Sequence, residues 1–102
     1  MNLNNLTLKT QEAIQTAQQY AFEKKHPQIE DEHLFYGLLE VDHNVVPFLF
    51  NKLDVDIEIL KGLNNKSLDK FSKVEGSTQI ISQKASKTLM NALSIAKKQK
   101  DE

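Results

Sequence analysis

The sequence has 102 residues, enough for at most one domain, and its hydrophobic share of 39% suits a folded chain rather than a disordered one. Its 13 basic residues, all lysine, are balanced by 14 acidic residues for a net charge of -1. This balance, together with the absence of arginine, argues against a nucleic-acid or membrane partner. The absence of cysteine excludes disulfides, thiolate catalysis and cysteine zinc sites. No apolar run is long enough for a signal peptide or a membrane span, so we expect a cytoplasmic protein.

The first expected helix runs from Thr7 to about Lys24. The Thr7 hydroxyl can cap its first free N–H groups, and Pro27 is expected to end it, because the residue before a proline is disfavoured in a helix. Three of its five apolar positions are alanines, which allow another helix to approach closely. These positions recur at helical spacing and form one face: Ala13, Ile14, Ala17, Tyr20 and Ala21.

The second expected helix spans Asp31–Glu40, and the acidic residues around its start suit the helix dipole. Gly37 lies inside this helix, where glycine costs about 1 kcal/mol relative to alanine. We therefore expect Gly37 to mark a close contact between two helices. The predicted buried stripe of this helix consists of large apolar side chains: Leu34, Phe35, Leu38 and Leu39.

Two further helices are expected in the middle of the chain. One spans Val45–Leu53 with Asn44 as its cap, and the other runs from Ile57 to about Leu68 with Asp56 as its cap. The inward positions predicted for the latter are Ile57, Leu60, Leu63 and Leu68. The aromatic residues at helical spacing are interpreted as core rather than as a ligand pocket: Tyr20, Phe35, Phe48 and Phe50.

Residues 69–80 show no periodicity and are predicted to form a linker. The last helix is expected to begin at Ser82 and to run to about Lys100, with small and apolar residues on one face: Ala85, Leu89, Ala92, Leu93 and Ala96. No segment alternates with a period of two over a useful length. The predicted fold class is therefore all-α.

The first and last helices resemble each other at an offset of 75 residues. Thr7 aligns with Ser82, and three core pairs coincide: Ile14 with Leu89, Ala17 with Ala92 and Ala21 with Ala96. A fixed period indicates a twofold helical repeat, with residues 1–68 as the first unit and 81–102 as only the first helix of the second. Apolar surface on the last helix would then lack its usual cover, so we expect either a monomer or a weak dimer.

The histidines invite a metal or catalytic interpretation, which the spacing does not favour. Pro27 interrupts the segment that contains His26, Glu30 and His33, and no His-Glu-x-x-His pattern exists, so no metal site is predicted. His33 and its neighbour Glu32 would point about 100° apart on a helix, which does not make an acid–base pair. A small metal-dependent hydrolase remains the alternative from a different class, and a metal analysis of the purified protein would decide it.

Several motifs occur in a characteristic order along the whole chain: Asn4–Thr7, Gln11–Ala13, Ile29–Leu34, Gly37–Leu39, Val45–Leu49 and Val74–Gly76. Together they resemble the N-terminal domain of Clp ATPases, and within that family the ClpB-type disaggregases most closely. The resemblance implies an all-α double repeat of four-helix units, of which this chain holds the first repeat and the first helix of the second. Three positions depart from the family pattern: Lys25 and its counterpart Lys100 stand where glycine is usual, and Asp31 replaces a common proline.

The resemblance also implies a function. A Clp N-domain of this type binds exposed apolar segments of misfolded or aggregated proteins, or adaptor proteins, and helps to deliver them to a hexameric AAA+ ring. The matching substrate-groove positions are Thr7, Leu89 and Asp101. No phosphate-binding loop is present, so no cofactor is expected in this domain, and ATP and Mg²⁺ would belong to the parent protein's ATPase modules.

An alternative within the same binding class is the adaptor or phospho-arginine docking domain of a ClpC- or ClpA-type unfoldase. Glu32 lies where that subfamily has an acidic ligand-binding residue. The opening motif and the Val74–Gly76 motif favour the ClpB-type interpretation over this one. Competition by free phospho-arginine would distinguish the two.

Overall fold

The computed structural model describes residues 8–101, without the side chains of residues 96, 97 and 99–101. Within that range the chain forms mainly helices, together with one pair of two-residue strands. In chain order these are α1 (Leu8–Glu23), β1 (Gln28–Ile29), α2 (Asp31–Val41), α3 (Val45–Lys52), α4 (Ile57–Asp69), β2 (Ile80–Ile81) and α5 (Gln83–Asp101). The predicted all-α fold class is confirmed, and the helix bounds agree with those expected to within one or two residues.

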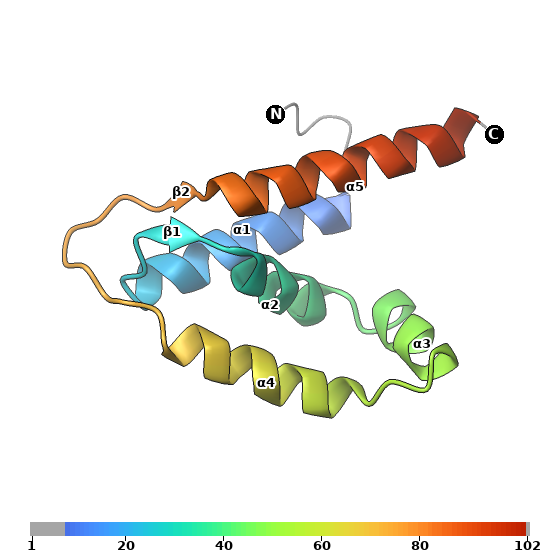
Figure 1. Ribbon diagram of the computed structural model, residues 1–102, viewed down its shortest axis with the longest axis horizontal. Helices are drawn as coiled ribbons and strands as arrows, with labels where there is room; N and C mark the ends of the chain where they lie inside the picture. The colour runs from blue at the N-terminus through green and yellow to red at the C-terminus, as the bar shows by residue number, and fades with distance from the viewer. Residues whose placement is uncertain (1–7, 102) are drawn as a thin grey trace.

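Helix α2 is the centre of the arrangement. It contacts α1, α4 and α5, whereas α3 contacts α4. Figure 1 shows α4 along one side of α2, with α1 and α5 on the other side and α3 beyond one end. The segment of residues 70–79 leads from α4 back past the end of α1 to β2.

Helices α1 and α2 pack closely where they cross. Four residues of the predicted α1 face are buried (Ala13, Ile14, Ala17 and Ala21), and Tyr20 is half-buried. Gly37 faces them from α2, and a Cβ atom placed on it would lie 2.1 Å from the carbonyl oxygen of Ala13. The prediction that Gly37 marks a close helix contact is therefore confirmed, and its partner is the backbone of α1.

The buried stripe of α2 differs from the one that was predicted. The large apolar residues are only half-buried, and the buried positions are His33 and Gly37, one helical turn apart. The reason is the crossing itself, because the face that contains Gly37 is the one that α1 approaches. The leucines and Phe35 flank this contact instead of filling it.

Helix α1 is ended by Lys25 rather than by Pro27, which corrects the sequence-based expectation. Lys25 adopts the left-handed conformation with φ 62°. The N–H of Lys25 donates to Phe22 O at 3.1 Å, and the N–H of His26 donates to Ala21 O at 2.9 Å. This pair of bonds is the Schellman motif, which satisfies the last helical carbonyl groups. Lysine thus takes up the backbone role for which glycine is the favoured residue.

Replacing Lys25 by glycine is expected to stabilise the protein by about 0.5–1 kcal/mol, since a left-handed conformation is unfavourable for a residue with a Cβ atom. The Lys25–Glu75 ion pair that would be lost is exposed, so it contributes little. Urea denaturation monitored by circular dichroism would measure the change. The control, Lys66→Gly on the exposed face of α4, should destabilise by about 1 kcal/mol, and the same loss at Lys25 would contradict the prediction.

The strand pair was not predicted. β1 and β2 run parallel, with Gln28 opposite Ile80 and Ile29 opposite Ile81. Ile29 is fully buried against Ala17 and Ala21, and the half-buried Leu34 and Ile81 pack on this cluster. The pairing therefore ties the start of α5 to the core between α1 and α2.

Asn44 stands at the predicted N-cap position of α3, but the side chain that caps the helix is that of Asp42. The Asp42 carboxylate accepts hydrogen bonds from the N–H groups of Asn44, Val45 and Val46 at 2.9–3.1 Å, whereas Asn44 makes no side-chain cap. These backbone N–H groups, that of Asn44 foremost, lower the pKa of Asp42 below its ordinary value. The predicted cap of α4 is confirmed, because Asp56 accepts one bond from the Glu58 N–H.

Removing the Asp42 carboxylate with Asp42→Ala is expected to lower the urea midpoint more than Asp56→Ala does. Three N–H groups lose their acceptor in the first case and one in the second. Because the pKa of Asp42 is lowered in the folded state, the carboxylate stabilises the fold at neutral pH. This stabilisation declines as the pH falls below the pKa of an ordinary aspartate. Equal midpoint losses for the two variants at pH 7 would contradict this expectation.

Two predicted core positions of α3 and α4 are in fact exposed, and so is Ala92 of α5. Leu63 of α4 is 56% exposed and Phe48 of α3 is 57% exposed. On the same helices, Leu68 is fully buried and the Phe50 ring meets Phe35 edge-to-face. Helical periodicity identified the apolar residues correctly, but both helices carry more apolar surface than their neighbours in the described part of the chain cover.

Candidate functional site

The three predicted site residues are placed unequally by the structure. Thr7 lies outside the described residues. Leu89 is half-buried in the middle of α5, and Asp101 ends α5 with a side chain outside the described set. The grouping of these three residues in one groove therefore stays a prediction, and α5 is the element on which it depends.

The beginning of helix α5 is fixed by a side-chain cap and a buried alanine. The Ser82 hydroxyl oxygen accepts a hydrogen bond from the Ala85 N–H at 3.1 Å, and Ala85 is fully buried. This confirms the predicted helix start at Ser82. Further along, Leu89 and Leu93 are half-buried, while Met90 is 61% exposed and Ile95 is 58% exposed. We call these four residues, which lie on more than one face of the helix, the α5 apolar surface.

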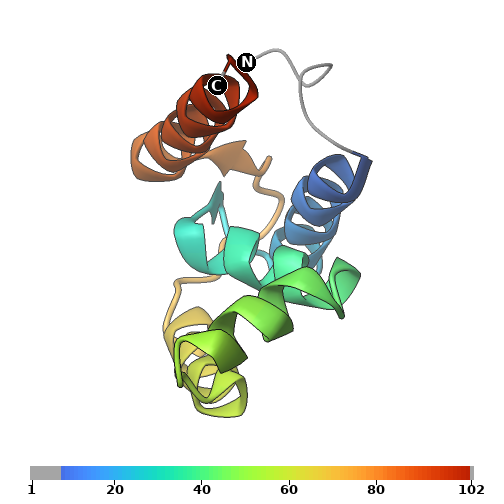
Figure 2. The same cartoon turned by 90° about the vertical axis from the view of Figure 1, so that its right-hand side faces the viewer.

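The two views of the ribbon show how α5 lies relative to α1. In Figure 1 the helices run in opposite directions and overlap in projection. Seen end-on in Figure 2, they stand apart, with α2 lying between and below them. Each contacts α2, so α2 forms the common base of both helices. The first residues of α1 and the middle of α5 thus belong to the same side of the molecule.

A second group of exposed apolar residues lies on α3 and α4. It consists of Val45, Phe48, Leu49, Leu53, Ile59 and Leu63, each more than half exposed. None of the α3 residues is buried. The predicted site residues do not include any member of this group, which serves below as a comparison surface.

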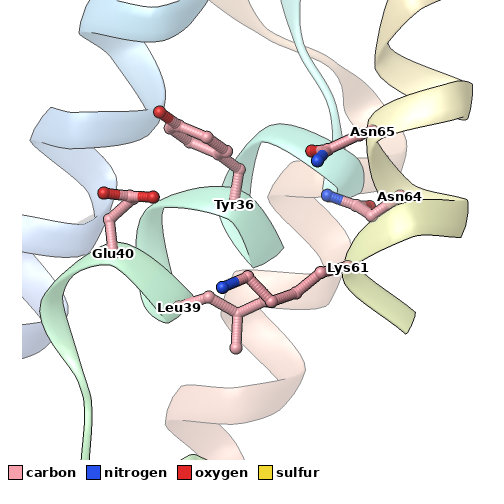
Figure 3. Close-up of a pocket in the computed structure, with 6 residues that line it drawn as sticks. All are labelled: Tyr36, Leu39, Glu40, Lys61, Asn64 and Asn65. Carbon is pink, nitrogen blue, oxygen red and sulfur yellow. The ribbon is translucent and has the colours of Figure 1, made fainter. Parts of the chain in front are cut away.

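Two hollows in the described surface differ in size. Figure 3 shows one between α2 and α4, with a volume of about 50 Å³ and a lining of mainly polar residues: Tyr36, Leu39, Glu40, Lys61, Asn64 and Asn65. It is too small for a peptide or a nucleotide, since ligand pockets typically measure roughly 300–1,000 Å³. The other is an open hollow of about 350 Å³ between the end of α1 and residues 74–79. Neither contains Leu89.

His26 and His33, for which a metal site was not predicted, lie against each other. The distance from His26 Nδ1 to His33 Nε2 is 2.8 Å, and both rings are buried. A nitrogen of each ring is thus occupied by the other ring. Within the described part of the chain, no group of three or more potential metal-ligating side chains occurs. His33 is also fully buried, so it does not meet a substrate as an acid or base.

The sequence reasoning missed two features of this region. Met90 and Ile95 fall outside the alanine–leucine stripe predicted for α5, yet they are its most exposed large apolar residues. Their wide angular separation from Leu89 and Leu93 on the helix was the available signal that α5 is apolar on more than one face. The contact between His26 and His33 carried no local signal, because the two residues are seven positions apart and belong to different helix ends.

The described helices include none that is both long and apolar enough to cross a membrane.

Comparisons with a protein family and with individual proteins point to the same family. Residues 5–102 match the family described as the Clp repeat (R) N-terminal domain. The chain is 31% identical over 102 residues to the chaperone protein ClpB of Bacteroides thetaiotaomicron, covering 100% of this chain and 12% of that protein. It is 40% identical over 77 residues to the chaperone protein ClpB of Bacillus anthracis, covering 76% of this chain and 9% of that protein.

The chain spans only 9–12% of the length of these two relatives, so the similarity concerns one domain of them. The match extends through the α1–α2 core as well as through α5, and it agrees with the resemblance carried by the sequence motifs. The chain belongs to the Clp repeat (R) N-terminal domain family, and its curated relatives are ClpB chaperones.

Proposed function

We propose that this chain is the substrate-recognition domain of a ClpB-like AAA+ disaggregase. In this role it binds exposed apolar segments of misfolded or aggregated proteins and passes them to the ATPase ring. The observation that carries the proposal is the α5 apolar surface, Leu89, Met90, Leu93 and Ile95, within a domain whose relatives are named chaperone protein ClpB.

The physical argument concerns what an unfolded chain offers. Such a chain exposes apolar side chains without a fixed order, and burying apolar area contributes roughly 25 cal/mol per Å² whatever the sequence. A helix with a flexible methionine and aliphatic neighbours can adapt to many such segments. Met90 and Ile95 are accessible on α5, and the first turn of the helix is fixed by Ser82.

The remaining parts of the proposal concern the chemistry of the domain, the parent protein and the groove residues. The domain itself is non-catalytic and holds no cofactor, and ATP and Mg²⁺ act in the AAA+ modules. The parent assembles as a homohexamer in the cytoplasm, and adaptor proteins are further partners of the domain. Thr7 and Asp101 contribute to the binding groove together with Leu89.

An NMR titration tests the proposal. The labelled chain is titrated with a permanently unfolded polypeptide, reduced and carboxymethylated α-lactalbumin, while backbone amide shifts are followed. We expect shifts concentrated at Leu89, Leu93 and the end of α5. Leu89→Ser should weaken binding about tenfold, whereas Leu49→Ser on the α3–α4 comparison surface should leave it unchanged. Shifts confined to α3 and α4, or no shifts, would refute the assignment.

A second titration with free phospho-arginine tests the docking alternative. Glu32 is on α2, and the backbone carbonyl oxygen of this residue accepts a hydrogen bond from the Asn64 side chain at 3.0 Å. Indifference of the amides around Glu32 to phospho-arginine is the result expected. Saturable shifts there would replace the ClpB-type role by that of a ClpC- or ClpA-type docking domain.

A further inference from the structure

The buried contact between His26 and His33 takes no part in the proposed binding role. His26 is 3% exposed and His33 is fully buried. His26 follows the left-handed Lys25 at the end of α1, and His33 is in the first turn of α2. The contact therefore joins the end of one helix to the start of the next, at the corner where the chain also forms β1.

The hydrogen bonds define the protons on both rings. The Glu30 backbone N–H donates to His33 Nδ1 at 2.9 Å, so that nitrogen carries no proton. The proton of neutral His33 is therefore on Nε2, which donates to His26 Nδ1 at 2.8 Å. A proton added to His33 Nδ1 would face the Glu30 N–H, and one added to His26 Nδ1 would face the Nε2 proton of His33. Neither acceptor nitrogen within this network can bind a proton without breaking a hydrogen bond.

The surroundings oppose a positive charge as well. Burial lowers the pKa of both rings, to about 4 for His33, with His26 as the second cause there. Lys73 in the segment after α4 and Lys24 at the end of α1 lower the pKa of His26 further, and Asp69 at the end of α4 opposes them. The Tyr20 ring of α1 and the Phe71 ring cover the pair, the latter stacked on His33 with ring centres 5.3 Å apart.

The same corner holds the segment that leads to α5. Besides the Phe71 stacking, the Gln79 side chain donates to His26 O at 3.2 Å, and the Val74 N–H donates to Lys25 O at 2.8 Å. The Ile80 N–H approaches Pro27 O at 3.4 Å, where β2 begins. Every one of these contacts depends on the backbone or ring positions of residues 25–33.

From this geometry we infer that the His26–His33 pair is an acid-sensitive latch. While both rings are neutral, the pair holds residues 71–80, and with them β2 and the first turn of α5, against α1 and α2. Protonation breaks the ring-to-ring bond or the Glu30–His33 bond and releases that segment. The released state uncovers Ile29 and Ile81, which the closed state buries or half-buries.

The direction of the pH effect follows from the lowered pKa values. An opened or unfolded histidine has a pKa near 6.5, so the open form binds protons more strongly than the closed form. The contribution of the pair to the closed form is complete above about pH 6.5. It declines as the pH falls from 6.5 towards 4, the value for His33.

Hydrogen exchange of the full chain at a series of pH values tests the latch. Amide protection factors, corrected for intrinsic exchange rates, are compared between pH 7.5 and 5 at Ser82, Ala85 and Ser86 and across α1. We expect protection at the start of α5 to fall roughly tenfold or more, from the difference between pKa values of 6.5 and about 4, while α1 retains its protection. An equal fall in α1 would indicate general unfolding and would overturn the latch.

Two histidine variants make the test specific. In His33→Gln the side-chain oxygen can still accept from the Glu30 N–H, as in a capping box, but it binds no proton near pH 5. This variant should lose the pH dependence at Ser82 and Ala85, whereas His43→Gln, on the exposed connection between α2 and α3, should keep it. If amide protection at Ser82 and Ala85 fell between pH 7.5 and 5 in His33→Gln as much as in the wild type, the latch would be overturned. Should that variant fail to fold, ¹⁵N NMR of the wild-type rings decides instead, since a proton on His33 Nδ1 at pH 7.5 would refute it.

Discussion

Replacing Gly37 by alanine is expected to destabilise the protein by about 2 kcal/mol or more, although alanine is the better helix former. The new Cβ atom would lie 2.1 Å from the Ala13 carbonyl oxygen and 3.1 Å from the Ala17 backbone nitrogen. Both neighbours belong to the backbone of α1, so no side-chain rotation relieves the contact. The two helices would have to separate, and the buried faces of Ala13 and Ala17 would lose their packing.

Gly62 in α4 is the matched control, because it is also a helical glycine, but apart from its own chain neighbours and helix backbone no described atom lies within 4 Å of the place that a Cβ atom would take. Gly62→Ala should stabilise the protein by about 0.5–1 kcal/mol through helix propensity alone. Urea denaturation followed by circular dichroism compares the two variants directly. Opposite signs are the expected result, and stabilisation by both alanines would show that α1 and α2 are not in close contact at Gly37.

These glycines illustrate what could be predicted from the sequence. Local signals placed all five described helices, because apolar periodicity and caps such as Asp56 and Ser82 are properties of short segments. The alanine-rich face of α1 and the role of Gly37 also followed, since small residues on a helix imply close approach. That a glycine inside α4 has open space around it could not be predicted, because the difference depends on the neighbouring helix.

Two kinds of error originate in long-range contacts, namely the strand pair and the exposed apolar positions, whereas the error in the α3 cap is local. The pairing of Gln28 with Ile80 joins segments 52 residues apart, and strands of two residues show no alternation. The cap of α3 was assigned to the nearest suitable side chain, Asn44, when Asp42 reaches three N–H groups from two residues earlier. Exposure of Phe48 and Leu63 depends on which helices cover them, and a helical pattern does not contain that information.

The candidate site shows the same division. The apolar character of α5 and its start at Ser82 followed from the sequence, whereas the choice of Thr7, Leu89 and Asp101 came from the family resemblance. The structure places Leu89 on the helix that carries the α5 apolar surface. It also shows that Met90 and Ile95, which no periodic stripe included, present the larger accessible area.

Truncating Ile29 to alanine is expected to cost about 3 kcal/mol of unfolding free energy, the middle of the usual range for a buried isoleucine. Ile29 is fully buried, and it fills the space between Ala17 and Ala21 of α1, with Leu34 of α2 and Ile81 of β2 around it. The two alanines on the opposite side cannot extend into the space that is vacated. The cavity would therefore persist, and the free energy of unfolding would fall by the full value of the lost contacts.

The control for this truncation is Ile80→Ala, one residue before Ile81 in β2. Ile80 is opposite Gln28 in the strand pair but is 58% exposed, so its truncation should cost less than about 1 kcal/mol. Urea midpoints at constant slope would measure both changes. Similar losses for the two variants would mean that the strand pair, rather than the cluster beneath it, supplies the stability. A large loss of stability at Ile29 alone would establish that this residue, which lies outside the helices, anchors the start of α5 to the α1–α2 core.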